Sequence, residues 1–521
     1  MASIDGTVTE QGLAKGTNWW GAFVIGLAGT ILVTGIAPYV VQGTGALGIL
    51  LMGVMTLAGC FLCFCLAELA TMWPDRTGGI PSYATESFRP LVGNTAARHF
   101  GGVSGWAYWL GWFPVAPINV ILTASYLAVL FNFSPGHMVD PAGTTWGTPI
   151  GITIVAICFL LLIAIFIPAY LGIRLGAAFA TVLGVLSMLP ITLMIFLPFF
   201  KPSTIHWGNV AGFHAPPHVA VTVTFIAAWF FPILWNVIAM EAAACYVGEC
   251  RGGARDAKIA LTAEGLFGVF IYIATPLMFV AVLGLALTTA DPLTLYVTYT
   301  EKIFGHGSWV DWFVGIPLIA ALALSVLNAI MGCGRSLYQA AEDGLLPRFF
   351  EHKNRHGVPD LAMGFNVVCS MILVLLGSPV RIYIISNGGY LLSCSLALLG
   401  YFVYRQLRPE VPRPFRLPTW MKWIALAVFI IWTVIYFFGG WNSPKIVLAD
   451  PHQGPGLYLL GLLIVALYAP LYWWRRAQDR RHAAAGAPAG AVAAVGAPDG
   501  AAGGADPVAG SEASGEPPVV R

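Results

Sequence analysis

Long stretches without a charged residue constrain this chain more than any other feature of its sequence. They recur along most of its length, at residues 16–67, 100–139, 141–173, 175–200, 265–290, 312–334, 361–380, 382–404, 423–444 and 453–474. A helix needs about 20 apolar residues to cross the hydrocarbon core of a bilayer, so the longest stretch has room for two crossings. Together with residues 219–248, which contain a single charged residue, the pattern predicts an all-α, polytopic membrane protein with about twelve transmembrane helices.

The composition and the placement of the basic residues support this fold class. Charged residues make up 10% of the chain and hydrophobic residues 58%, whereas a soluble domain has about 25% charged residues. If the N-terminus is cytoplasmic, most arginines and lysines fall in cytoplasmic loops, and the outer loops hold only Lys201, Lys302, Arg381 and Lys445. Because positively charged loops stay inside, we expect a multi-pass protein of the cell (plasma) membrane, surrounded by the lipid bilayer, with both termini cytoplasmic.

Several partners and cofactors are not expected from this sequence. The formal net charge of +2 gives no basic surface for a nucleic acid, because the basic residues follow the loops. The nine cysteines lie mostly in apolar stretches and are expected to be buried side chains, so we predict no metal site and no cofactor. Residues 1–18 are expected to form a cytoplasmic tail without a cleavable signal. Residues 475–521, dominated by Ala, Gly and Pro toward their end, are expected to form a disordered cytoplasmic tail.

Two apolar stretches carry residues that interrupt helices. The first contains Gly26, Gly29, Gly35 and Pro38, and the second is the region Trp235–Met240, which is preceded by Pro232. An interrupted helix leaves backbone N–H and C=O groups unpaired at membrane depth, which is tolerated only beside protein or a water-filled cavity. Transporters use such groups to hold small charged substrates. The alternative for the first stretch is close helix packing through glycine, with a kink at the proline.

Glu241 is the charged residue in the apolar stretch 219–248. Placing a charged side chain at the centre of a bilayer costs about 2.5–3.5 kcal/mol, so such a residue faces a partner, a water-filled cavity or a substrate. Burial disfavours the charged form of a carboxyl group, which allows it to take up and release a proton. Glu241 is therefore the candidate for proton coupling. The alternative is a position near a helix end.

Three segments have a pattern found in one superfamily of secondary transporters. They read LAELATMWPDRTGGIPSYATESF (66–88), ECRGGARDAKIA (249–260) and GRSLYQAAEDGLLPRFFEHKNRHGVPDLAM (334–363). Over residues 19–474 the chain resembles the amino acid–polyamine–organocation (APC) superfamily and its amino acid permeases. The spacing of Arg-x-x-Tyr, Asp-Gly-Leu-Leu-Pro and Gly-Val-Pro in the third segment is the strongest part of this resemblance. In the second segment, Gly252, Gly253 and Lys258 replace the residues that are usual in the family.

The resemblance implies a leucine-transporter-like fold of five-plus-five inverted repeats. The first repeat would cover residues 19–200 (spans one to five) and the second residues 201–404 (spans six to ten), followed by spans eleven and twelve at residues 405–474. Spans one and six head the two repeats and are interrupted in this family. The two interrupted stretches of this chain would then be counterparts that meet at the binding site.

On span one, the resemblance places the substrate-binding break at Val33, Thr34 and Gly35, with Thr30 one turn earlier. Thr34 and Gly35 would offer backbone N–H groups to a substrate carboxylate, as helix N-termini do for anions. Val33 stands where the family has glycine, so the break is expected to be tighter or differently placed.

Span six supplies the rest of the expected substrate site. Trp235 would be an aromatic gate that covers a substrate ammonium by cation–π contact. Backbone carbonyls near Trp235 and Ile238 would accept hydrogen bonds from that ammonium, and the Asn236 amide would add another.

Other polar residues within the spans have two interpretations. Asn119 and Asn328, near the middles of spans three and eight, either line the substrate site or join neighbouring helices. Glu68, near the end of span two, is expected to support the following loop through Arg76 or Arg89.

Together these features predict a secondary active transporter and not an enzyme, because no nucleophile or metal constellation stands at membrane depth. We expect it to carry an amino acid or related small amine by alternating access, as a proton-coupled importer (symporter). The predicted span five, residues 175–200, has no lysine to mimic a sodium ion. Sodium coupling, amino acid or amine exchange, and a polyamine- or ethanolamine-type permease are the alternatives, and a nutrient sensor with a transporter-like body is the alternative from another class. The sequence leaves the oligomeric state open.

Overall fold

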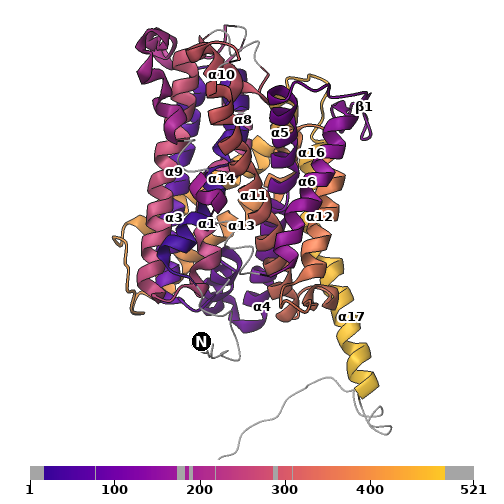
Figure 1. Cartoon of the computed structure of the whole chain (residues 1–521). Helices are drawn as coiled ribbons and strands as arrows, with labels where there is room; N and C mark the ends of the chain where they lie inside the picture. Colours follow the sequence, from indigo (N-terminus) through magenta and orange to yellow (C-terminus); the bar gives the residue numbers. More distant parts are fainter. Residues whose placement is uncertain are drawn as a thin grey trace, which may run out of the picture. The chain divides into compact units, whose positions relative to one another are not determined.

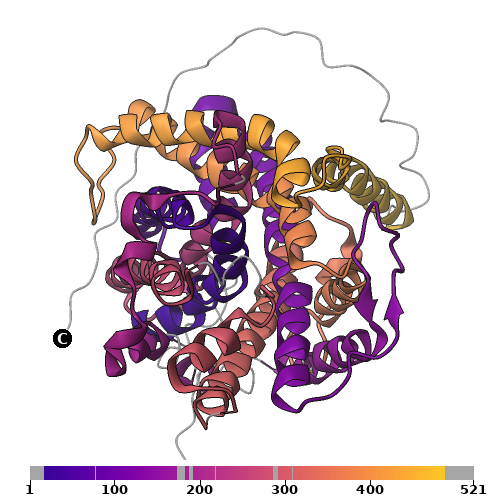
Figure 2. The ribbon, with the colours of Figure 1, turned by 90° about the horizontal axis from the view of Figure 1, so that it is seen from above.

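The computed structural model describes residues 17–76, 78–172, 182–186, 192–217, 219–284, 291–307 and 309–486. The chain divides into two units, one ending at Arg475 and the other beginning at Arg476. The first unit is almost entirely helical, and its long helices run side by side (Figure 1), as the view along their axes also shows (Figure 2).

The α-helices of the described residues are α1 (Trp19–Thr30), α2 (Val33–Thr44), α3 (Leu47–Met72), α4 (Ile80–Trp112), α5 (Val115–Leu130), α6 (Ile152–Tyr170), α8 (Val223–Val237), α9 (Gly253–Leu283), α10 (Leu295–Phe304), α11 (Trp309–Glu342), α12 (Asp360–Val374), α13 (Pro379–Leu407), α14 (Met421–Val434), α15 (Gly440–Val447), α16 (Gly456–Ala466) and α17 (Tyr468–Gly486). The 3₁₀-helices are η1 (Leu197–Phe200), η2 (Pro202–Thr204), η3 (Trp207–Asn209), η4 (Ala211–Phe213), η5 (Ile238–Glu249) and η7 (Arg348–Glu351), and η8 (Ile435–Gly439) is a π-helix.

Ten segments of the described residues are long and apolar enough to cross a membrane: Trp19–Thr44, Leu47–Met72, Ile80–Leu130, Ile152–Tyr170, Val223–Gly248, Gly253–Leu283, Gly315–Glu342, Pro379–Leu407, Met421–Val447 and Gly456–His482. Helix α12 is apolar but shorter, and residues 175–181 and 187–191 of the span predicted at residues 175–200 lie outside the described residues. The described residues thus hold ten of the about twelve predicted spans. The all-α, polytopic membrane class is confirmed.

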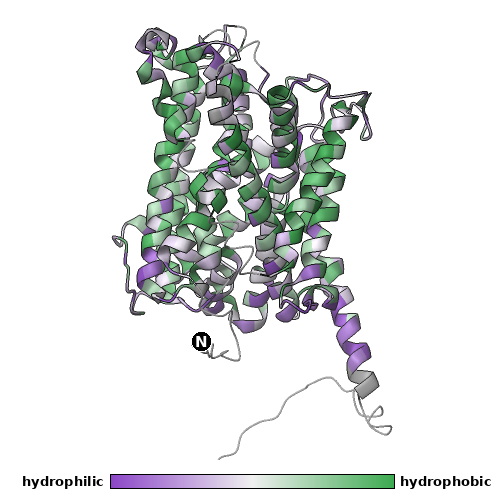
Figure 3. Cartoon of the chain, in the orientation of Figure 1, coloured by the Kyte–Doolittle hydropathy of each residue, from purple (hydrophilic) through white to green (hydrophobic). Residues whose placement is uncertain are grey.

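The outer surface of the helices is apolar. On α6, Leu160, Ile163 and Ile167 are 66%, 48% and 52% exposed. Figure 3 shows apolar residues along the length of the helices and polar residues gathered toward their two ends. Large exposed aliphatic side chains are unfavourable in water and favourable in hydrocarbon, so these surfaces fit a lipid environment.

The connections between spans are mostly short or helical. Helix α4 is kinked at Gly93, whose φ of 76° is readily available only to glycine. Two short strands, β1 (Met138–Val139) and β2 (Ile150–Gly151), pair antiparallel between α5 and α6, with Met138 opposite Gly151. This loop donates no residue to the expected substrate site.

The first span is interrupted, but not where the resemblance placed the break. Helix α1 ends at Thr30 and α2 begins at Val33, so the break lies at residues 31–32, two residues before the position that the resemblance implied. A displaced break was the expectation from Val33 standing where the family has glycine. Two hydroxyls lie beside carbonyls just before the break. The Ser325 hydroxyl lies 3.3 Å from the carbonyl oxygens of Ala28 and Ala321, and the Tyr272 hydroxyl lies 3.1 Å from the Gly29 carbonyl oxygen and 2.8 Å from that of Asn236. A hydroxyl that donates to Ala28 or Gly29 competes with the α-helical ladder at this point.

The second interruption lies within the predicted segment. Helix α8 ends at Val237, and the chain continues as the 3₁₀-helix η5 over Ile238–Glu249. A 3₁₀ run of 12 residues is unusual, because runs beyond three or four residues are uncommon and a 3₁₀ stretch within a helix often marks a functional hinge. Helix α1 packs against η5, so the two interrupted spans lie together.

The expected partners of Glu68 are corrected by the structure. The Glu68 carboxylate pairs with Arg405 at 3.3 Å and with Arg413 at 3.0 Å, while Arg76 and Arg89 both pair with Glu86. Glu68 is fully buried near the end of α3, beside α13 and the loop that follows it. Burial lowers the pKa of the Arg413 guanidinium, and the Glu68 carboxylate opposes that shift.

Helix α17 continues into the segment for which disorder was expected. It reaches Gly486 through a run of Arg, Gln and Ala, residues with high helix propensity. Residues 487–521 lie outside the described residues.

Candidate functional site

Glu241 lies fully buried in η5, and three side chains donate hydrogen bonds to one of its oxygens. The hydroxyls of Tyr390 and Tyr108 donate to Oε1 at 2.7 and 2.9 Å, and the Trp112 indole donates to the same oxygen at 3.3 Å. The other oxygen, Oε2, is buried and has no hydrogen-bond partner among the described residues. Hydrogen bonds donated to a carboxylate stabilise its ionised form. The site therefore holds one carboxyl oxygen in place through three donors and leaves the second without a protein partner among the described residues.

Two helices far from Glu241 in the sequence supply these donors. Tyr108 and Trp112 lie four residues apart on α4, which places them on one face of the helix. Tyr390 lies on α13, and its ring contacts the Tyr108 ring edge to face at 5.8 Å. These three residues are not among the site residues predicted from the sequence. The only local signal was the aromatic run WAYWLGWF at residues 106–113, whose i, i+4 spacing could have indicated an aromatic face.

A small cavity lies beside the Glu241 cluster. Its lining residues are Tyr108, Trp112, Ala242, Cys245, Tyr246, Asn328, Gly332 and Cys333, and its volume is about 20 Å³. Such a volume accommodates about one water molecule. Of the predicted site residues, the structure brings Asn328 to this cavity, where its amide oxygen accepts a hydrogen bond from the Tyr246 hydroxyl. The site is thus closed around Glu241 in this conformation.

Trp235, the predicted gate, is buried among aromatic side chains and lies just before the break in span six. Its indole N–H donates to the Gly111 carbonyl at 2.9 Å, and its ring packs on Tyr383 with a centroid distance of 4.9 Å. A methyl group built on Gly35 would lie 2.3 Å from the Tyr383 hydroxyl oxygen, so only glycine leaves room for that hydroxyl. Tyr383 therefore connects Trp235 with Gly35, and Trp235 also contacts Tyr390 at 6.5 Å.

The polar groups of the predicted residues of span one form hydrogen bonds within that span. The hydroxyls of Thr30 and Thr34 donate to the carbonyls of Leu27 and Ile31. The backbone N–H groups of Thr34 and Gly35 donate to the carbonyls of Ile31 and Leu32 at 2.9 and 3.0 Å. Val33 is fully buried, as is Ile238 on the other interrupted span. The N–H groups expected to face a substrate carboxylate are thus already paired in this conformation.

Two predicted amides keep unpaired atoms in the interior. Asn236 donates to the Pro232 carbonyl at 3.0 Å, and its Oδ1 atom has no hydrogen-bond partner among the described residues. Both side-chain polar atoms of Asn119, on α5, are likewise buried without a partner in the described part of the chain. An unpaired buried amide is costly, so these atoms are suited to a bound molecule or water.

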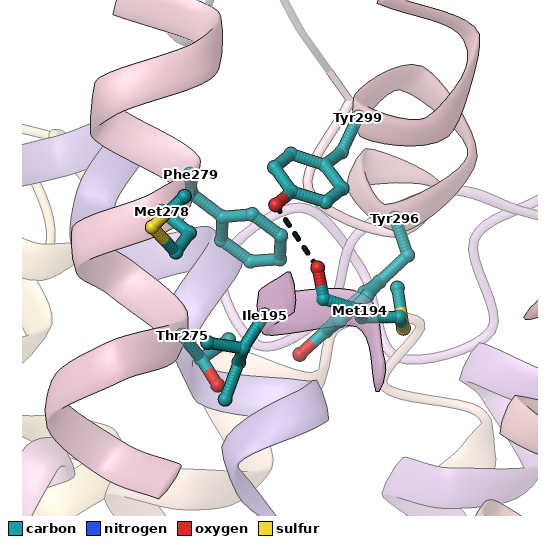
Figure 4. A pocket seen from close by; sticks show the side chains of 7 residues that line it. All are labelled: Met194, Ile195, Thr275, Met278, Phe279, Tyr296 and Tyr299. Atoms are coloured by element: carbon teal, nitrogen blue, oxygen red, sulfur yellow. Dashed lines mark hydrogen bonds between the residues drawn. The ribbon is translucent and has the colours of Figure 1, made fainter. Parts of the chain in front are cut away.

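A second small cavity lies apart from these residues. Figure 4 shows it between Met278 and Phe279 of α9, Tyr296 and Tyr299 of α10, and Met194. Its volume is about 10 Å³, and the Tyr299 hydroxyl donates to the Met194 carbonyl at 3.1 Å. None of the predicted site residues lines this cavity, and its lining is mainly apolar.

The long apolar helices form a bundle in which the two interrupted spans pack against each other, and the second of these spans carries the buried carboxylate of Glu241. Residues 18–467 match the family model described as amino acid permease. The chain belongs to the amino acid permease family, and the resemblance to the APC superfamily is confirmed.

Known relatives are distant in sequence. Polyamine transporter PUT1 of Oryza sativa subsp. japonica is 25% identical over 364 residues, which cover 68% of this chain and 60% of that protein. A putative arginine/ornithine antiporter of Escherichia coli (strain K12) is 23% identical over 329 residues, which cover 60% of this chain and 64% of that protein. The chain thus spans less than two thirds of the length of either relative.

A solved structure shares the fold. The crystal structure of the Eremococcus coleocola manganese transporter aligns with a TM-score of 0.51 and 12% identity, covering 92% of this chain and 99% of that one. At this identity the likeness concerns the fold alone, and it agrees with the predicted transporter architecture.

Proposed function

We propose that this protein is a secondary active transporter that carries an amino acid or related small amine across the plasma membrane by alternating access, with protons as the coupling ion. The observation that carries the proposal is Glu241. Its Oε1 atom accepts three hydrogen bonds, and its buried Oε2 atom has none from the described residues. No ion pair of Glu241 with Lys, Arg or His occurs in the described part of the chain. A buried anion without a counter-charge is costly, so a cationic ligand fits this position.

The aromatic surroundings of Glu241 favour an ammonium group in the substrate. Trp235, Tyr108, Trp112 and Tyr390 all lie around the break in span six, and aromatic faces attract cations, tryptophan most strongly. Trp235 would cover the bound ammonium as a gate, with the carbonyls near Trp235 and Ile238 accepting its protons. Capture of a substrate carboxylate at Thr34 and Gly35 has less support, because their N–H groups are paired here.

The other predicted residues would complete the site after it opens. Asn119, Asn236 and Asn328 are the amides that could bind polar groups of the substrate, and Asn119 and Asn236 have buried atoms without protein partners in the described residues. The cavity at Asn328 has room for about one water. Substrate entry therefore requires the broken spans to move away from α4 and α13.

The proposed arrangement of the chain follows the inverted-repeat plan. Residues 19–200 would form the first repeat, residues 201–404 the second, and both termini would lie in the cytoplasm. The close packing of α1 on η5 supports this plan. A single parallel β-bridge between the backbones of Thr17 and Cys250 also supports it, and there the Arg251 N–H donates to the Thr17 carbonyl at 3.0 Å.

Exchange of amines is the second candidate function. A carboxylate that pairs with an ammonium in one step can hold a proton in the next, so Glu241 would serve either a proton-coupled importer or an exchanger. Two relatives named as a polyamine transporter and a putative arginine/ornithine antiporter favour cationic amines as the substrate class.

Reconstitution into liposomes tests the proposal. The protein would first be screened for thermal stabilisation by arginine, ornithine, putrescine and a wider set of amino acids and amines. Compounds that stabilise it would then be tested for uptake with and without an imposed pH gradient, and for exchange against internal substrate. We expect a cationic amine to be accumulated with the gradient. Saturable exchange without gradient-driven accumulation would select the second candidate, and no uptake of any stabilising compound would reject transport.

A further inference from the structure

A second carboxylate, Glu264, is fully buried in the same region and has no role in the site described above. It lies on α9, and its Oε2 atom accepts a hydrogen bond from the backbone N–H of Ala243 at 2.9 Å. Its Oε1 atom is buried and has no hydrogen-bond partner among the described residues. Glu264 therefore holds the middle of η5 through a single neutral donor.

Glu264 lies on the face of α9 that packs along the interrupted span six. Glu264, Gly268 and Tyr272 are spaced four residues apart and so lie along one side of the helix. Going along this face, Glu264 contacts Ala243, Gly268 approaches Met240, and the Tyr272 hydroxyl lies 2.8 Å from the Asn236 carbonyl. The same hydroxyl lies 3.1 Å from the Gly29 carbonyl of span one. This face thus contacts both interrupted spans next to their breaks.

The Glu264 carboxyl group fits against span one because Gly26 has no side chain. A methyl group built on Gly26 would lie 2.6 and 2.8 Å from the two Glu264 oxygens and 2.8 Å from the Ala243 nitrogen. The carboxyl group is therefore enclosed between α1, α9 and η5. A change in the distance between α1 and η5 would alter its exposure directly.

The two buried carboxylates have different surroundings. Both carboxyl groups are fully buried without a counter-charge among the described residues, which favours the neutral acid at each. At Glu241 three side-chain hydrogen bonds oppose this effect, whereas Glu264 accepts a single hydrogen bond, from a backbone N–H. Two carboxyl groups whose environments differ in this way commonly take different roles in one site.

The groups that face Glu264 from the described residues supply no positive charge. They are the thiol of Cys63 on α3, Glu241 on η5 and Tyr272 on α9 itself, and α1 contributes Gly26. A metal ion is a poor occupant, because hard cations take six or more oxygen ligands, and the described residues contain no cluster of His, Cys, Asp or Glu suited to a metal. A proton needs only the one unpartnered oxygen.

We propose that Glu264 is a proton-binding site separate from the amine site at Glu241, and that it is protonated while α1 and η5 are closed around it. This proposal rests on the proposed transport function for its role in the cycle. A proton from external water would form the O–H bond at Oε1 before closure. When α1 and η5 separate toward the cytoplasm, water reaches the carboxyl group, the O–H bond breaks and the proton leaves with that water.

Infrared spectroscopy of the purified protein tests the proton directly and needs no substrate. A protonated buried carboxyl group gives a carbonyl stretch that is distinct from that of a carboxylate. We expect this band in the wild type at neutral pH and its loss in Glu264→Gln, which keeps an acceptor for the Ala243 N–H. Glu410→Gln is the matched control, because Glu410 is an exposed glutamate, and it should keep the band. If Glu264→Gln does not fold, Glu264→Met gives the same readout. A band of unchanged intensity in the folded variant would overturn the proposal.

Transport separates this proposal from the proposed function. In liposomes that show gradient-driven uptake of arginine, ornithine or putrescine, each pH unit supports about tenfold accumulation for one coupled proton. Glu264→Gln should reduce accumulation to the level without a gradient while exchange of the same amine continues. Unchanged gradient-driven accumulation in Glu264→Gln would overturn the coupling role. Absence of uptake by the wild type would reject the proposed function, and the infrared result would still decide whether Glu264 holds a proton.

Discussion

Glu68 and Glu241 are both fully buried glutamates on membrane-spanning segments, and they differ in what faces them. Glu68 pairs with Arg405 and Arg413, so its charge is balanced by the protein itself. Glu241 faces the hydroxyls of two tyrosines and an indole N–H, all of them neutral. Burial alone therefore does not identify a functional carboxylate. The presence or absence of a cationic neighbour separates a group that joins helices from one that is available to a ligand.

The contrast between Glu68 and Glu241 predicts that a substitution of Glu241 has the largest effect on transport. Glu241→Gln removes the charge and keeps the size, so concentrative uptake of cationic amines should be abolished while the protein still folds. Uptake into liposomes under a pH gradient measures the first effect, and thermal unfolding in detergent measures the second. Retained gradient-driven uptake in this variant would remove Glu241 from both substrate binding and coupling.

Glu68 should behave in the opposite way, with a loss of stability. Glu68→Ala leaves Arg405 and Arg413 buried without their partner, and removal of one member of a buried ion pair costs about 3–5 kcal/mol. Denaturant unfolding in detergent measures this difference. The matched control is Glu410→Ala, because Glu410 is exposed and pairs with Arg408 at 3.6 Å, and exposed pairs contribute about 0–1 kcal/mol. If Glu68→Ala and Glu410→Ala lower the free energy of unfolding equally, the buried ion pairs of Glu68 are not what distinguishes it.

The neutral hydrogen-bond donors to Glu241 can be tested one at a time. Tyr390→Phe and Tyr108→Phe each remove one hydrogen bond to a charged group, which contributes about 1.5–3 kcal/mol. We expect weaker amine binding in both variants, with the larger loss in Tyr390→Phe because its bond of 2.7 Å is the shorter. Tyr458→Phe is a suitable control, since Tyr458 packs against Phe231 and Tyr436, away from Glu241. Binding equal to wild type in both test variants would exclude these hydroxyls from a role in holding the carboxylate.

The smallest predicted effect concerns the gate. Trp235→Ala removes the aromatic face proposed to cover the ammonium, a contact of about 0.5–2 kcal/mol, and should weaken substrate occlusion. Trp235→Phe keeps an aromatic ring and loses only the hydrogen bond to Gly111, so its transport should lie closer to the wild type. The apparent affinity and rate of uptake are the measurements. Unchanged kinetics in Trp235→Ala would contradict the gate assignment.

The membrane fold could be predicted from the sequence because hydropathy is a local property. Uncharged stretches predicted the spans, and the region Trp235–Met240 with the preceding Pro232 predicted an interruption, which occurs at Ile238 as a change to a 3₁₀-helix. The break in span one was misplaced by two residues. The hydroxyls beside it belong to Ser325 and Tyr272, which are 297 and 243 residues away from the carbonyls of span one that they contact.

The partners of the buried glutamates were not predictable for the same reason. The sequence selected Glu241 from the cost of a charge in an apolar span, but its donors lie 129, 133 and 149 residues away. For Glu68 the nearest basic residues in the sequence were chosen, and the folded chain brings Arg405 and Arg413 instead. Glu264 was overlooked because it lies just before an uncharged stretch, and only the packing of α1, α9 and η5 reveals its burial.

The most direct test of the central claim is an electron cryo-microscopy structure of the protein with a bound amine, using arginine or putrescine as whichever compound stabilises it more. The account predicts an ammonium group within hydrogen-bond distance of the Glu241 Oε2 atom, with the Trp235 ring over it and the Glu68 ion pairs unchanged. An amine bound away from Glu241, with Oε2 still unpartnered, would contradict the claim that this carboxylate receives the substrate.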